Sequence, residues 1–191
     1  MEKIISTLMR TKDLYTKNGT YVYKMAQMNQ KWDKLLELLF EYPNKRFTVR
    51  QIAKKTNIPS SSIQRYLERL RKEHFIKKNE LIINNYSKFL KAFFIVNKIH
   101  KMGLVDYLRE ELNPSVIIVF GSVRKGEYDY ESDIDLFVES SVKKDLDLSR
   151  FEKILKHKIQ LFIESDINKL QSNLFNNVIN GIKLFGSFKI K

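Results

Sequence analysis

Hydrophobic residues recur at helical spacing in the first half of this chain, and strand-like runs join them in the second half. Between residues 31 and 85, apolar positions three or four apart predict helices at 31–42, 49–56 and 60–73. Two short strands at 75–78 and 81–83 are expected to follow, around a tight turn. Thr48 is suited to the N-cap of the second helix, and the serines after Pro59 are suited to that of the third.

The second half alternates helical and strand patterns. One apolar stripe along 86–112 predicts a single long helix, kinked near Met102-Gly103 and stopped by Asn113-Pro114. The apolar run at 116–120 is typical of a strand buried on both faces, and 134–138 predicts a second strand. A helix at 143–157, a strand at 158–163, a helix at 168–180 and a closing strand at 181–186 complete the pattern. The predicted fold class is therefore α+β.

Polar residues follow the first of the two central strands and begin the second. Gly121-Ser122 follows the buried run, and glycine lets backbone approach a phosphate while serine adds a hydroxyl donor. Asp133 and Asp135 begin the next strand and, two residues apart, project to the same face. Two adjacent carboxylates repel each other unless a cation neutralises them, and oxygen ligands of this kind suit Mg²⁺. Aspartates that merely cap the turn of a hairpin are the structural alternative.

The spacing Gly121-Ser122, then ten residues, then Asp133-x-Asp135 is similar to the signature of the minimal nucleotidyltransferases of the DNA polymerase β superfamily. This resemblance implies transfer of a nucleoside monophosphate from a Mg²⁺-bound nucleoside triphosphate, expected to be ATP, to a hydroxyl of a protein or nucleic acid. It implies that the two aspartates hold Mg²⁺ and that the Gly-Ser turn binds the β- and γ-phosphates. Arg124 and Lys125 would then neutralise charge on the leaving pyrophosphate.

One position departs from that family. A third carboxylate on the adjacent strand is expected to activate the attacking hydroxyl, and the position that fits is Gln160, which cannot accept a proton at neutral pH. Glu164 shares its face but lies about 13 Å farther along the strand. Two hypotheses stay open: a transferase of reduced or specialised activity, and a nucleotide-sensing transcriptional regulator that binds DNA without transfer chemistry.

The helix, helix, turn, helix and hairpin of 31–85 resemble a winged helix-turn-helix domain. In that arrangement the third helix would enter the major groove of double-stranded DNA and the hairpin would form the wing. Short polar and basic side chains on these elements are suited to base edges and phosphates. The candidate DNA-binding residues are Arg50, Ser61, Ser62, Gln64, Arg65, Arg69, Lys77 and Lys78. A protein-docking module with a solvated basic face is the alternative.

Charge supports this division of the chain. Residues 31–85 carry 13 basic and 6 acidic side chains, whereas residues 113–191 carry 12 and 11, so the excess of +13 lies mainly upstream. A basic segment beside a nearly neutral one is typical of a nucleic-acid-binding module joined to another domain. We therefore expect an N-terminal extension at 1–30, a winged helix-turn-helix at 31–85, a linker helix at 86–112 and a nucleotidyltransferase-like domain at 113–191.

Composition adds the remaining expectations. No cysteine is present, no apolar run could span a bilayer, and the N-terminus lacks the pattern of a signal peptide, which together predict a cytoplasmic protein without membrane contact. Asn18-Gly19 in the extension predicts a hairpin or a frayed arm. The apolar stripe of 86–112 is also suited to a homodimer interface.

Overall fold

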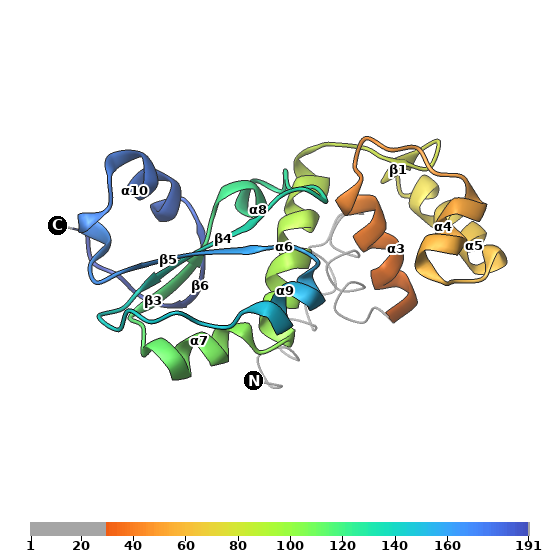
Figure 1. Cartoon of the computed structure of the whole chain (residues 1–191). Coiled ribbons are helices and arrows are strands. Elements are labelled where there is room, and N and C mark those ends of the chain that lie inside the picture. The colour runs from red at the N-terminus through yellow and green to blue at the C-terminus, as the bar shows by residue number, and fades with distance from the viewer. Residues whose placement is uncertain (1–29, 191) are drawn as a thin grey trace, which may run out of the picture.

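The computed structural model describes residues 30–190, so the hairpin or arm predicted in the N-terminal extension lies outside the described residues. The first described unit is three helices followed by a two-stranded hairpin (Figure 1). These elements are α3 (Gln30–Glu41), α4 (Val49–Thr56), α5 (Ser60–Lys72), β1 (Ile76–Lys77) and β2 (Glu80–Leu81). Their order is that of a winged helix-turn-helix, as the pattern of apolar residues predicted.

Local signals explain where these helices begin and end. Thr48 caps α4 through a capping box, in which its hydroxyl accepts from the Gln51 N–H and the Gln51 side chain accepts from the Thr48 N–H. The prediction that serines cap α5 is wrong, because Pro59 holds the N-cap position and the serines form the first turn. Lys78 and Asn79 both have positive φ, as a tight hairpin turn requires.

The long segment after the hairpin forms two helices, α6 (Asn85–Lys101) and α7 (Leu104–Leu112), instead of the single helix expected. Gly103, with φ of +76°, separates them, because a left-handed residue redirects the chain and ends the first helix. The apolar stripe of this segment packs largely inside the chain: Ile99, Leu104 and Leu108 are buried. Phe89 remains 52% exposed.

A four-stranded mixed sheet forms the rest of the structure, in the order β5-β4-β3-β6. Its strands are β3 (Val116–Val119), β4 (Ile134–Glu139), β5 (Ile159–Glu164) and β6 (Ile182–Gly186). β3 runs antiparallel to both β4 and β6, and β4 runs parallel to β5. The connecting helices are α8 (Gly121–Lys125), α9 (Ser149–Leu155), η1 (Ile167–Lys169) and α10 (Ser172–Ile179).

Two predicted helices are shorter than expected. The helix predicted at 143–157 begins only at Ser149, and the one predicted at 168–180 is divided into η1 and α10. The strands agree more closely with the sequence pattern, and the α+β fold class with a winged helix followed by a mixed, helix-flanked sheet is confirmed. Among the described residues, no helix is long and apolar enough to cross a membrane.

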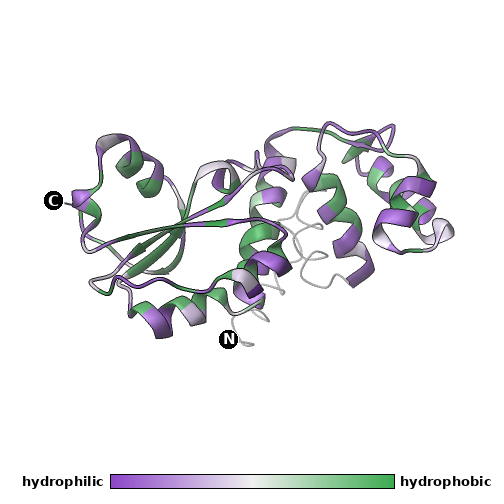
Figure 2. Ribbon diagram, in the orientation of Figure 1, coloured by the Kyte–Doolittle hydropathy of each residue, from purple (hydrophilic) through white to green (hydrophobic). Residues whose placement is uncertain are grey.

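The sheet is covered by helices on both faces. Leu136 and Val138 belong to a core that also contains Ile95 of α6 and Phe151 of α9. Phe137, on the opposite face, packs in a smaller core together with residues of η1 and α10. Since the residues of β3 are buried on both faces, its continuous apolar run is explained (Figure 2).

The larger core continues without interruption into the winged helix. Phe40 of α3 contacts Phe75 beside the hairpin and Phe94 of α6, with ring centroids 6.2 and 5.4 Å apart. Figure 1 shows α6 between α3 and the sheet. The segment expected to be a linker is therefore a central core element, and the two halves of the chain are packed against each other.

Candidate functional site

The turn between β3 and α8 is shaped to accept a carboxylate. Gly121 has φ of +66°, and a Cβ atom placed there would lie 2.0 Å from Oδ2 of Asp135. Glycine is therefore required at this position twice over, by its left-handed conformation and by the close approach of the carboxylate. The turn and the second aspartate, 14 positions apart in the sequence, thus form one site.

The two aspartates lie together at the start of β4. Asp133 is exposed just before the strand and Asp135 is partly buried within it. Burial raises the pKa of the Asp135 carboxyl, and the nearby Asp133 charge raises it further. A cation between them would reverse both effects by stabilising the ionised forms. No cluster of three or more His, Asp or Glu side chains in residues 30–190 is arranged as a metal site.

Gln160 lies beside this pair in the sheet. The parallel register aligns Asp135 with Gln160, and partners in register project to the same face. Glu164 is aligned with Glu139 at the far end of the same strand, where it receives a hydrogen bond from the Ser165 N–H and pairs with Lys143 at 3.4 Å. The nearest acid of β5 is therefore bound elsewhere, and a neutral amide occupies the position adjacent to Asp135.

Basic residues follow the Gly-Ser turn. Arg124 and Lys125 are exposed in the last turn of α8, and Ser122 is partly exposed in its first turn. Among the described residues, neither cation forms an ion pair with a carboxylate. Both charges are thus available to an anionic ligand that approaches the turn.

The loop between α8 and β4 is held by a buried lysine that the sequence pattern did not single out. Lys91 of α6 is 1% exposed, donates to the Tyr128 carbonyl and lies 4.6 Å from the centroid of the Tyr128 ring. Burial lowers the Lys91 pKa to about 8, although the charges of Glu41, Asp129 and Glu127 oppose this shift. A hydrophilic residue on an apolar stripe was the only signal that could have found it.

A second buried contact links this loop to the winged helix. His157 is 5% exposed; its Nδ1 lies 2.6 Å from the Ser132 carbonyl and its Nε2 lies 2.9 Å from Oε1 of Glu41 in α3. Burial lowers the His157 pKa, but the hydrogen bond and charge of Glu41 outweigh it and the net shift is upward. Both partners are acceptors, so the doubly protonated ring satisfies both. His157 therefore supports the residue before Asp133.

The candidate DNA-binding residues lie on α4, α5 and the hairpin. Most are exposed: Arg50, Ser61, Gln64, Arg65, Arg69, Lys77 and Lys78, with Ser62 partly exposed. The Arg65 Nη2 lies 3.4 Å from the Ser62 hydroxyl, so these two act as a pair. Arg69 is engaged within the domain, because it pairs with Glu73 at 3.3 Å and lies 5.4 Å from the centroid of the Trp32 ring.

Comparison with known families agrees with this geometry. Residues 101–184 match the family model described as a nucleotidyltransferase domain, which includes the Gly-Ser turn, both aspartates and Gln160. Residues 34–77 match the model described as winged helix-turn-helix DNA-binding. Comparisons with curated proteins and with solved structures gave no significant match. The chain is a fusion of an N-terminal winged helix-turn-helix domain with a nucleotidyltransferase domain.

Proposed function

We propose that this protein transfers a nucleoside monophosphate from a Mg²⁺-bound nucleoside triphosphate to a hydroxyl acceptor. The observation that carries the proposal is the contact between the Asp135 carboxylate and the Gly121 backbone. It brings the expected phosphate-binding turn against an expected metal ligand, and a triphosphate chelated to a cation must contact both. A hairpin with turn-capping aspartates would require no such approach.

The residues present fit a divalent cation. Asp133 and Asp135 offer oxygen ligands, and a Mg²⁺ site typically completes its shell with phosphate oxygens and water. When bound, the cation would neutralise charge on the triphosphate and polarise its phosphoryl oxygens. The backbone N–H groups and hydroxyl of the Gly-Ser turn would hold the β- and γ-phosphates, and Arg124 and Lys125 would stabilise the leaving pyrophosphate.

The proposed step is an in-line displacement at the α-phosphorus. The acceptor oxygen forms a bond to that phosphorus, and the bond from phosphorus to the oxygen bridging to the β-phosphate breaks, which releases pyrophosphate. The acceptor proton has to leave as well. Because Gln160 cannot take it, the proton passes to water or to a phosphate oxygen of the nucleotide, and we expect slow transfer as a result.

Substitution of Gln160 tests this role. We expect Gln160→Asp to raise the transfer rate by about 10²-fold or more, because it supplies both a proton acceptor and a metal ligand. Gln160→Asn is the matched control, since it has the shape of aspartate without the charge. The assay is incorporation of label from each α-labelled nucleoside triphosphate, ATP first, in the presence of Mg²⁺. Brisk wild-type transfer that neither substitution alters would show that Gln160 is not the third catalytic position.

Transfer by the wild type, compared with a double variant that lacks both aspartates, distinguishes an enzyme from a nucleotide sensor. Asp133→Asn/Asp135→Asn should abolish Mg²⁺-dependent nucleotide binding under either hypothesis. Transfer that is detectable in the wild type and lost in this variant supports the enzyme. Tight, metal-dependent binding without transfer, even in Gln160→Asp, would instead establish a sensor.

We further propose that the winged helix binds duplex DNA through the exposed side chains of α5 and the wing. The basic charge of this half and the exposure of Gln64, Arg65, Lys77 and Lys78 support the proposal. In this proposal Arg65 would contact base edges and the wing lysines would contact phosphates. Arg65→Ala should therefore reduce sequence preference, as measured by selection of bound sites from a random duplex library.

A further inference from the structure

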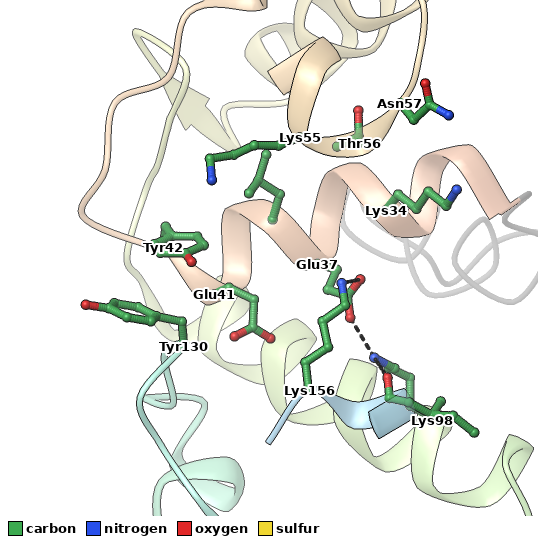
Figure 3. A pocket seen from close by; sticks show the side chains of 12 residues that line it. Lys34, Glu37, Glu41, Tyr42, Lys55, Thr56, Asn57, Lys98, Tyr130 and Lys156 are labelled. Atoms are coloured by element: carbon green, nitrogen blue, oxygen red, sulfur yellow. Dashed lines mark hydrogen bonds and ion pairs between the residues drawn. The ribbon is translucent and has the colours of Figure 1, made fainter. Parts of the chain in front are cut away.

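A cleft of about 690 Å³ lies between the two domains, and its lining does not include Gly121, Asp133 or Asp135. Figure 3 shows side chains from α3, α4, α6 and the loop before β4 around it, together with Lys156 next to α9. Its lining includes Lys34, Glu37, Tyr42, Lys55, Tyr130 and Lys156. Because both domains contribute, a ligand in this cleft would contact each of them.

The cleft is basic. Lys98 and Lys156 both pair with Glu37, at 2.7 and 2.9 Å, so these three side chains leave one positive charge. The other carboxylate of the lining, Glu41, is occupied by His157. Lys34 and Lys55 are exposed and form no ion pair with a carboxylate of residues 30–190. The free charge therefore favours an anionic ligand.

An aromatic platform adjoins these lysines. Tyr42 and Tyr130 are stacked, with ring centroids 4.7 Å apart and planes inclined by 21°. Tyr42 covers one side of the Tyr130 ring, yet Tyr130 remains 51% exposed. Lys55 Nζ lies 5.7 Å from the centroid of the Tyr42 ring. An open aromatic ring close to the Lys55 ammonium group combines the two features by which proteins bind single-stranded nucleic acid: base stacking and phosphate contact.

The length of the cleft favours a strand over a mononucleotide. Lys34 and Tyr42 are eight positions apart on and just beyond α3, which corresponds to about 12 Å along the helix axis. A strand offers several phosphates over such a length, whereas a mononucleotide has its charge at one end. We propose that this cleft binds a single-stranded nucleic acid, with a base stacked on Tyr130 and phosphates contacted by Lys34 and Lys55.

This site stands near the transfer site without depending on it. Tyr130 precedes Asp133 by three residues, so their Cα atoms lie at most about 11 Å apart. A strand held in the cleft would end close to the nucleotide, as an acceptor must. It would also contact α3 and α4 of the winged helix, so occupancy of the cleft is expected to stabilise the packing of the two domains.

Fluorescence anisotropy with a labelled oligodeoxyadenylate of about eight nucleotides tests the proposal. All variants carry Lys77→Ala/Lys78→Ala, which removes the wing lysines as an alternative binding surface. We expect Tyr130→Ala to weaken binding by about 5- to 150-fold, and Tyr130→Phe to retain it, since stacking needs the ring. Lys34→Ala/Lys55→Ala should reduce the slope of log affinity against log salt by about 1.4, the loss of two phosphate contacts.

Matched controls make the result decisive. Lys183→Ala/Lys189→Ala removes two exposed lysines from the other end of the chain and should bind as the background does. Mg²⁺-dependent nucleotide binding, measured on the same cleft variants without a strand, should match the background, so this proposal and the transfer proposal can fail separately. Cleft variants that bind like the lysine control would overturn the site. If a polyglutamate peptide displaces the labelled strand as well as the unlabelled oligodeoxyadenylate does, the cleft does not select nucleic acid. If adenosine monophosphate binds as tightly as the oligodeoxyadenylate, the cleft does not select a strand over a mononucleotide.

Discussion

Replacement of Gly121 by alanine should disable the candidate nucleotide site while the fold survives. The added Cβ would lie 2.0 Å from Oδ2 of Asp135, where real Cβ contacts stay beyond 3.0 Å, so the carboxylate or the turn must move by about 1 Å. The left-handed backbone, with φ of +66°, adds about 1–2 kcal/mol of strain. A displacement of about 1 Å among reacting groups lowers the reaction rate by about 10²-fold, so we expect a loss of that order in nucleotide affinity or in the transfer rate.

Gly103→Ala is the matched control for this substitution. Gly103 is also left-handed, with φ of +76°, but nothing lies within 4 Å of the Cβ that alanine would add. Gly103→Ala should lose about 1–2 kcal/mol in urea unfolding and Gly121→Ala at least as much, and only Gly121→Ala should lose Mg²⁺-dependent binding of a fluorescent nucleotide. Equal nucleotide binding by the two variants would refute the role of the contact between Gly121 and Asp135.

Three further outcomes follow from the buried charges and the wing. Because burial lowers the Lys91 pKa from 10.5 to about 8, the unfolded chain binds more protons than the folded chain above pH 8, and Lys91 should contribute a rise in stability of about 2 kcal/mol between pH 7 and 9.5 in urea titrations. Lys91→Met should lack this rise. Burial lowers the His157 pKa, but Glu41 outweighs burial and the net pKa in the folded chain is raised. The protonated histidine therefore stabilises the fold fully below the unfolded pKa of 6.5, and this contribution disappears as pH rises through the folded pKa. Glu41→Gln should therefore cost about 3–5 kcal/mol at pH 6 and distinctly less at pH 9; a constant difference would contradict the ion pair. Lys77→Ala/Lys78→Ala should weaken all duplexes alike and lower the salt slope by about 1.8, in a filter-binding titration.

The fold could be predicted from the sequence wherever local signals and hydrophobic period agree. Thr48 and Gln51 mark the start of α4, and the alternation of 159–163 identifies β5 together with its register beside β4. That register predicts Gln160 as the position beside the aspartates, and the structure aligns Gln160 with Asp135. Its chemical role stays a prediction, because alignment of two residues in a sheet does not measure proton transfer.

The packing of one domain on the other could not be predicted, because it depends on residues far apart in the chain. Glu41 and His157 are separated by 116 positions, and nothing near either of them in sequence indicates the other. Lys91 was hidden for a similar reason, since its partner Tyr128 lies 37 positions away. The helix predicted at 143–157 is longer than α9, because Leu146 extends the apolar pattern that includes Phe151, although the polar residues around Leu146 are exposed and form no helix.

The continuous core has a consequence for how the chain folds and how it can be cut. Phe40 would lose its contact with Phe94 of α6 and become exposed if the winged helix were expressed without α6, although the match to the winged helix-turn-helix model ends at residue 77. Such a fragment should be marginally stable or aggregate, because the aromatic cluster of Phe40, Phe75 and Phe94 would be divided. The intact chain should unfold in a single cooperative transition, and hydrogen exchange should protect α3 and α6 together as one foldon.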